Sequence, residues 1–141
     1  MKESVYPCLW FDGNAREAAE FYCSVFPNSE KINSTPFVEI FSLNGKKFMG
    51  LNGGPEFKFN AAVSFVINCE TQEEIDHYWT KLTEGGEEGK CGWLVDKFGL
   101  SWQVVPSILG ELMSDPEKAP KVMYAFMQMK KFVIKDLLQA V

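Results

Sequence analysis

Few residues of this chain have both the type and the spacing that catalysis requires. The single histidine, His77, lies in a segment of helical periodicity, where a solvated outer face is favoured over a general base. The four cysteines are far apart and form no Cys-x-x-Cys pair, so buried thiols are favoured over a metal site or a nucleophile. The reactive residue types therefore do not indicate an active site.

A stronger candidate is the amide of Gln103. In residues 101–105 the alternation puts Ser101, Gln103 and Val105 on one face of a strand, with Trp102 and Val104 on the other. A strand this apolar is buried on at least one side. A buried amide must hydrogen-bond to something, so Gln103 either contacts a ligand or is satisfied by backbone or water.

Several other side chains could share a pocket with Gln103. Asn52 precedes two glycines, so it is either a polar ligand contact or a turn residue. Aromatic and aliphatic residues in neighbouring strands could supply apolar contacts or could belong to an ordinary core. The expected pocket-lining residues are Gln103, Asn52, Trp93, Phe65, Leu9 and Phe48.

The elements that position these residues follow one order. A strand at 5–11 leads to a helix opened by an Asn14/Glu17 capping box and ended before Pro27. Strands are then expected at 30–36, 38–43 and 46–51, with the Asn44-Gly45 pair forming a hairpin turn between the last two.

The same order then recurs in the second half of the chain. A strand at 62–68 precedes a helix opened by a Thr71/Glu74 capping box and stopped by two glycines at 85–86. Strands near 88–91, 93–97 and 101–105 follow. An offset of about 56 residues, on which Leu9 matches Phe65 and Phe48 matches Val104, relates the halves and predicts a duplicated βαβββ unit.

After Pro106 the pattern becomes helical, with one segment at 107–113 and another from about residue 120. The sequence thus predicts an α+β fold, with paired modules over residues 1–106 (about 1–55 and 60–106) and a helical extension over 107–141. We expect these parts to form one structural domain. The extension is expected to cover a sheet edge, a pocket mouth or a neighbouring subunit.

Charge and hydropathy exclude several partners. A net charge of −5 with a pI near 4.9 disfavours nucleic acid and anionic membrane surfaces, which require a basic face. No apolar run approaches the roughly 20 residues of a membrane span, and the N-terminal residues lack the apolar core of a secretion signal. A cytoplasmic location is the resulting expectation.

Longer motifs carry a family resemblance. The segments 7–14, 51–55, 57–60, 69–74 and 91–94, together with the turn and strand at 96–103, resemble the glyoxalase/bleomycin-resistance/dioxygenase superfamily, which has the vicinal oxygen chelate fold. Within it the chain is most similar to the PhnB-like branch, often labelled 3-demethylubiquinone 3-methyltransferase-like. The resemblance implies that each βαβββ unit curls into a half-barrel and that two halves make a ligand cavity.

The resemblance also implies where a divalent metal would be held. Enzymes of the superfamily use His or Glu on the first and fourth strands of each unit, which correspond here to positions near Pro7, near Asn52, at 62–64 and at Gln103. None of these is His, Asp or Glu, so no metal site is expected. No Gly-rich turn joins a strand to a helix as a nucleotide-type cofactor site requires, so no cofactor is expected either.

These observations favour a homodimer that binds a small, partly apolar molecule without a metal. The alternative is an enzyme, either a diverged metal-dependent lyase or dioxygenase or the methyltransferase of the family label. A third possibility gives the C-terminal helices a role in association alone.

Overall fold

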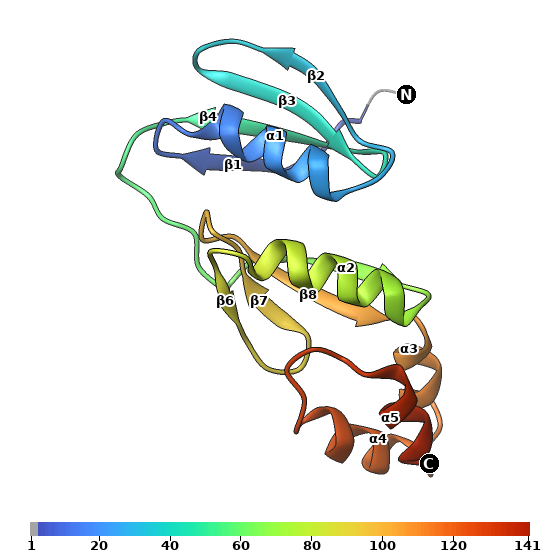
Figure 1. Ribbon diagram of the computed structural model, residues 1–141. Helices are drawn as coiled ribbons and strands as arrows, with labels where there is room; N and C mark the ends of the chain where they lie inside the picture. Colours follow the sequence, from blue (N-terminus) through green and yellow to red (C-terminus); the bar gives the residue numbers. More distant parts are fainter. Residues whose placement is uncertain (1–2) are drawn as a thin grey trace. The chain divides into compact units, whose positions relative to one another are not determined.

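Each half of the chain folds a four-stranded mixed sheet against one helix (Figure 1). The computed structural model describes residues 3–141, and the chain divides into two units, one ending at Phe59 and the other running from Asn60 to Val141. The elements of the first unit are β1 (Cys8–Phe11), α1 (Ala15–Val25), β2 (Glu30–Ser34), β3 (Val38–Leu43) and β4 (Lys46–Asn52).

The second unit repeats this order and adds three short helices. Its elements are β5 (Ser64–Cys69), α2 (Gln72–Thr83), β6 (Glu87–Glu88), β7 (Trp93–Val95), β8 (Ser101–Pro106), α3 (Ile108–Met113), α4 (Ala119–Phe126) and α5 (Ile134–Gln139). The strand orders are β1-β4-β3-β2 and β5-β8-β7-β6, with the first and last strands of each unit parallel. The predicted α+β fold of tandem βαβββ units is confirmed, and each sheet stays open.

The two sheets differ in register by four residues. Leu9 of β1 pairs with Gly50, 41 positions later, whereas its counterpart Phe65 pairs with Trp102, 37 positions later. The offset of 56 that relates the first strands therefore becomes 52 for the last strands, and the expected match of Phe48 with Val104 is displaced by four residues. Because four is even, the same face of each strand still points inward.

The core of the first unit lies between the sheet and α1. Phe41 and Phe48 are a cross-strand pair with parallel rings 5.6 Å apart, and Phe41 also stacks on Tyr22 of α1 at 6.4 Å. At Gly50 a side chain would meet Ala15 at 3.4 Å, so the missing Cβ lets helix and sheet approach closely.

The helix starts differ from the prediction in one unit and agree in the other. Asn14 makes no side-chain capping bond, so the predicted Asn14/Glu17 capping box of α1 is wrong. Thr71 does cap α2, because its hydroxyl accepts a hydrogen bond from the N–H of Glu74 at 3.2 Å. A distant residue takes the place of the missing local cap in α1, as described below.

The C-terminal helices belong to the second unit. The amide of Gln72 in α2 donates to the carbonyl of Phe132 at 2.9 Å and accepts from the N–H of Ile134 at 2.8 Å. Lys131 pairs with Asp76 at 2.8 Å, and the N–H of Gly92 donates to the carbonyl of Lys130. The segment before α5 is thus held along the start of α2 and the loop before β7.

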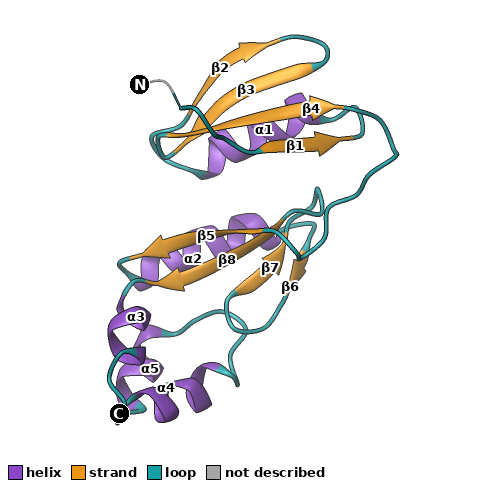
Figure 2. Ribbon diagram, turned by 180° about the vertical axis from the view of Figure 1, so that it is seen from behind, coloured by secondary structure: helices purple, strands orange, loops and turns teal. Residues whose placement is uncertain are grey.

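Both views show α1 and α2 each lying on one face of its own sheet, which leaves the other face without a helix of that unit (Figures 1 and 2). Within residues 3–141, none of the helices has the length and apolar character needed to cross a membrane.

Candidate functional site

The helix-free face of the second sheet holds two of the expected pocket residues. Pairing places Trp93 of β7 opposite Gln103 of β8, and Gln103 opposite Val66 of β5, so the three side chains share one face. Gln103 and Trp93 are half-buried, and Val66 is 56% exposed. This face is the candidate site, because it combines a polar amide, an aromatic ring and accessible apolar surface.

The amide of Gln103 has a definite partner. Its Nε2 donates to the hydroxyl oxygen of Ser64, the first residue of β5, at 3.0 Å. Within residues 3–141 the side chain of Gln103 makes no further hydrogen bond, so its Oε1 and the hydroxyl hydrogen of Ser64 remain able to bind other groups. The pair therefore offers an acceptor and a donor on the same face.

Ser64 as a partner of Gln103 was not expected from the sequence. The two residues are 39 positions apart, and their contact depends on the parallel pairing of β5 with β8. Periodicity puts both on strand faces but does not give the register that makes them neighbours.

The remaining apolar candidates lie on the other side of the sheets. Leu9 and Phe48 are only 5% and 3% exposed and belong to the core beneath α1. Phe65 is half-buried, pairs with Trp102 and has its ring 5.6 Å from that buried indole on the helix side of the second sheet. Phe65 therefore does not share the helix-free face with Gln103, and Leu9 and Phe48 belong to the core of the first unit.

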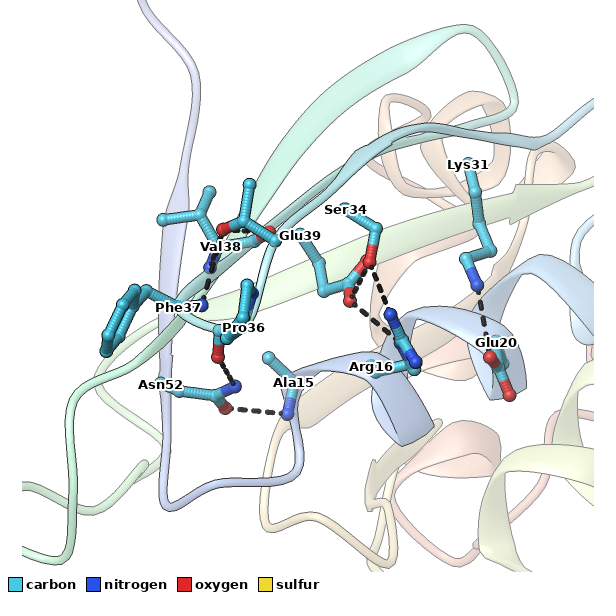
Figure 3. Close-up of polar contacts among 11 residues, drawn as sticks. Ala15, Arg16, Glu20, Lys31, Ser34, Pro36, Phe37, Val38, Glu39 and Asn52 are labelled. Atoms are coloured by element: carbon cyan, nitrogen blue, oxygen red, sulfur yellow. Dashed lines mark hydrogen bonds and ion pairs between the residues drawn. The ribbon is translucent and has the colours of Figure 1, made fainter.

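Asn52 holds the backbone of its own unit. Its Oδ1 accepts a hydrogen bond from the N–H of Ala15 at 2.9 Å, and its Nδ2 donates to the carbonyl of Pro36 at 3.1 Å (Figure 3). Both ends of the amide are occupied, one at the start of α1 and one in the β2–β3 loop. This side chain therefore supplies the cap that Asn14 does not.

A buried carboxylate lies near this cap. Glu39 is 1% exposed, its Oε1 accepts from the Ser34 hydroxyl at 2.6 Å, and it lies 3.5 Å from Nε of Arg16 (Figure 3). Arg16 also donates to Ser34 at 3.2 Å. The ion pair compensates a charge that would be costly to bury alone. The alternation in residues 38–43 puts Glu39 on the same face of β3 as the apolar Phe41. This pattern is the feature of the sequence that indicates the burial of Glu39.

Three of the four cysteines offer no activated nucleophile. Burial raises the pKa of the Cys69 thiol to about 12, and burial likewise raises the pKa values of Cys8 and Cys23. A nucleophilic cysteine needs a lowered pKa so that thiolate is present at neutral pH. His77, on α2, is exposed, as expected.

The positions that would hold the superfamily metal do not fit a divalent ion. Pro7 has no side-chain donor and its carbonyl accepts from the N–H of Met49, Asn52 is engaged at both ends, and Gln103 is bonded to Ser64. Hydroxyls and neutral amides are weak substitutes for imidazole and carboxylate. Over residues 3–141, no group of three or more His, Cys, Asp or Glu side chains is placed to hold a metal.

Neither the β1–α1 turn nor the β5–α2 turn resembles a phosphate-binding loop, and the β8–α3 connection consists of Ser107 alone. The β1–α1 turn has a single glycine, Gly13. The first N–H of α1, that of Ala15, already donates a hydrogen bond to Asn52. The β5–α2 turn contains no glycine, and the first turn of α2 carries Glu73 and Glu74, which repel an anion.

Two grooves are lined by residues other than Gln103. A groove of about 370 Å³ in the first unit is lined by residues that include Glu30, Ser42 and Lys47. A groove of about 680 Å³ in the second unit runs between the start of α2 and α5.

Comparisons with known proteins cover most of the chain. The family profile described as 3-demethylubiquinone-9 3-methyltransferase matches residues 3–105. The chain is similar to the PhnB protein from Bacillus cereus, with 32% identity over 74% of this chain and 100% of that chain, at a TM-score of 0.69.

Two more distant structures share the fold. Protein PA1353 from Pseudomonas aeruginosa is 20% identical over 74% of this chain and 98% of its own, with a TM-score of 0.61. The genomically encoded fosfomycin resistance protein FosX from Listeria monocytogenes, in complex with Mn(II) and a sulfate ion, is 15% identical over 81% and 97%, also at 0.61. None of the curated proteins matches the chain.

Proposed function

The chain belongs to the 3-demethylubiquinone-9 3-methyltransferase family, the PhnB-like branch of the glyoxalase/bleomycin-resistance superfamily, and we propose that it binds a small, partly apolar molecule without a catalytic metal. The observation that carries the proposal is the juxtaposition of Gln103, Ser64 and Trp93 on the helix-free face of the second sheet. A few polar groups within apolar surroundings are typical of small-molecule sites.

The absence of a catalytic metal is proposed from the donor set. FosX is described as a complex with Mn(II), whereas the positions that the superfamily resemblance assigns to metal ligands carry no His, Asp or Glu in this chain. Elemental analysis of protein purified without chelator tests this directly. Less than about one metal ion per ten chains is expected, and stoichiometric Mn, Fe, Ni or Zn would contradict the proposal and favour a lyase or dioxygenase.

Methyl transfer, the reaction in the family name, finds little support in the residues of this chain. None of the three strand-to-helix connections within residues 3–141 has the run of glycines that lets a backbone approach a nucleotide cofactor. Calorimetric titration with S-adenosylmethionine is expected to show no binding. A dissociation constant in the micromolar range would overturn this part of the proposal.

We further propose that the chain acts as a homodimer, because an open sheet face needs a second surface to enclose a ligand. Support comes from the outermost strand β5, in which Val66 is 56% exposed, and from Val63 just before it, which is 63% exposed. An unprotected apolar edge strand is a site for pairing with another chain. Light scattering should give twice the chain mass, and Val66→Lys should reduce it to one chain mass, whereas Met127→Lys, directly after α4, should leave it unchanged. A monomeric wild type contradicts the dimer.

Cytoplasmic location is proposed from the thiols. All four cysteines are free, and free thiols are typical of proteins in a reducing compartment.

The binding proposal is tested by a thermal-shift screen of small aromatic and amphipathic compounds on the full chain. Several compounds should raise the melting temperature, and mapping by NMR should put the largest shift changes on β5, β7 and β8. A screen without hits, or hits that map only to other surfaces, contradicts the proposal.

A further inference from the structure

The strand that carries Gln103, β8, and its two neighbours, β5 and β7, contain no ionisable side chain apart from the buried thiol of Cys69. β5 reads Ser-Phe-Val-Ile-Asn-Cys, β7 reads Trp-Leu-Val and β8 reads Ser-Trp-Gln-Val-Val-Pro, so none contains Asp, Glu, Lys, Arg or His. In contrast, each of the strands β2, β3 and β4 of the first unit carries at least one charged residue: β2 has Glu and Lys, β3 has Glu and β4 has two Lys. An uncharged set of three adjacent strands is therefore a property of the second sheet alone.

The fourth strand of this sheet, β6, adds a negative charge to this face. Glu87 of β6 pairs with Val95, and Val95 pairs with Ser101, so pairing puts Glu87 on the same side as Gln103 at the outer edge of the sheet. A bound anion would find no counter-charge on these strands and would be repelled, weakly, from the edge. Transferring an unpaired ion to a partly apolar surface is costly.

The polar groups that remain are complementary to a neutral partner. The Oε1 of Gln103 can accept, and the hydroxyl of Ser64 can donate once its oxygen has accepted from Nε2. A carboxamide or lactam presents a donor and an acceptor side by side. A carboxylate has only acceptors and would leave Oε1 facing oxygen, whereas an amidinium has only donors and would leave the hydroxyl hydrogen unmatched.

From these observations we infer that the second sheet recognises an uncharged ligand whose amide-like group binds the Gln103–Ser64 pair while its aromatic or aliphatic body lies along Trp93 and Val66. This inference rests on the proposed function and adds the class of ligand. It separates this chain from a protein that takes a sulfate-like anion, because nothing on β5, β7 or β8 would neutralise one.

Three isosteric probes test the ligand class: benzamide is neutral, benzoate is an anion and benzamidine is a cation. Each is titrated into the full-length protein at pH 7 and followed by proton–nitrogen NMR, in which the side-chain amide of Gln103 gives its own pair of signals. Benzamide should move these signals and should bind at least tenfold more tightly than benzoate or benzamidine. Equal or tighter binding of benzoate would overturn the inference.

Two substitutions of Gln103 sharpen the test. Gln103→Leu keeps the size but removes the hydrogen-bonding groups, so benzamide should bind about tenfold more weakly, as expected for the loss of one or two hydrogen bonds. Gln103→Glu adds a charge and should shift the preference to benzamidine. Gln128→Leu, on an exposed position after α4, is the matched control and should leave benzamide binding unchanged.

The outcomes distinguish a failure of the proposed ligand class from a failure of the proposed small-molecule binding. If no probe binds but the wider screen gives hits on β5, β7 and β8, the neutral-amide class is wrong and small-molecule binding stands. If neither the probes nor the screen bind there, both proposals fail. The wild-type selectivity decides the matter even if a Gln103 variant does not fold, which melting curves would reveal.

Discussion

The side-chain oxygen of Asn52 accepts a hydrogen bond from the backbone N–H of Ala15 at 2.9 Å, and so joins the end of β4 to the first turn of α1. The same amide donates to the carbonyl of Pro36. One side chain thus anchors the helix start and the β2–β3 loop, across 37 and 16 positions of sequence. Asn52 thus satisfies a free N–H at the start of α1, as a neighbouring N-cap side chain does in many helices.

Replacing Asn52 should therefore cost more stability than replacing the formal N-cap residue. We expect Asn52→Ala to lower the free energy of unfolding by about 1–3 kcal/mol, because it leaves a helix N–H and a carbonyl unpaired. Asn14→Ala is the control and should cost less than about 0.5 kcal/mol, since Asn14 makes no side-chain cap bond. Urea unfolding followed by circular dichroism measures both. Equal losses would show that the local cap matters as much as the distant one.

Gly92 and Gly110 should respond in opposite directions to alanine. Gly92 has φ +83°, and an added Cβ would lie 2.5 Å from the ring of Phe132 and 2.7 Å from the carbonyl oxygen of Val104. Gly92→Ala should lower the free energy of unfolding by about 1–3 kcal/mol through strain and displacement of Phe132.

Gly110 lies in α3 with open space around its missing Cβ. Gly110→Ala should raise the free energy of unfolding by about 0.5–1 kcal/mol, because alanine is the better helix former. Melting temperatures of the two variants and the wild type provide the comparison. A stabilising Gly92→Ala would contradict the packing of Phe132 on the loop before β7.

Stability should fall at alkaline pH because of Cys69. Burial, with a smaller contribution from the carboxylate of Glu74, raises the pKa of this thiol from 9.0 to about 12. The folded state thus holds the proton more tightly than the unfolded chain. The resulting stabilisation is complete below pH 9 and is lost as the pH rises from about 9 to about 12.

The melting temperature measured from pH 8 to pH 11 tests this dependence. The wild type should lose stability across that range, and Cys69→Ala, although less stable at pH 8, should show a flatter slope. If both proteins have the same slope, other groups cause the alkaline loss and the burial of Cys69 is not responsible.

Removing Gln72 should loosen the C-terminal segment without unfolding the sheet. Its amide hydrogen-bonds the backbone of Phe132 and of Ile134, besides donating to Asp76 of its own helix, and Gln72→Ala would leave both backbone groups unpaired. We expect faster tryptic cleavage after Lys130 or Lys131 and about tenfold faster hydrogen exchange at Ile134. Gln139→Ala, at the exposed end of α5, is the control and should leave cleavage unchanged. Unaltered exchange in Gln72→Ala would show that the segment is held by other contacts.

Local patterns predicted most of the fold. The Asn44-Gly45 hairpin, the extended Phe26 before Pro27 and the Thr71 cap depend on residues a few positions apart, and all three are present. The alternation in 101–105 correctly put Gln103 and Trp102 on opposite faces, since strand geometry fixes that choice without reference to any neighbour.

The candidate site was predicted less completely, because it depends on which strands are neighbours. The sequence identified Gln103 and Trp93 but grouped them with Leu9 and Phe48, which lie under α1. A buried side chain and a ligand contact have the same apolar character in a sequence, and only the side of the sheet that the helix covers separates them.

The sequence by itself determined the tandem βαβββ order, the uncharged strands around Gln103 and the lack of metal-binding residue types at the expected positions, because each is a matter of residue identity or short-range geometry. Only the tertiary structure decided that Ser64 meets Gln103, that Asn52 rather than Asn14 caps α1, and that Gln72 holds the C-terminal segment. These contacts join residues 37 to 60 positions apart, and such pairs are defined only once strand register and helix packing have brought distant backbone together.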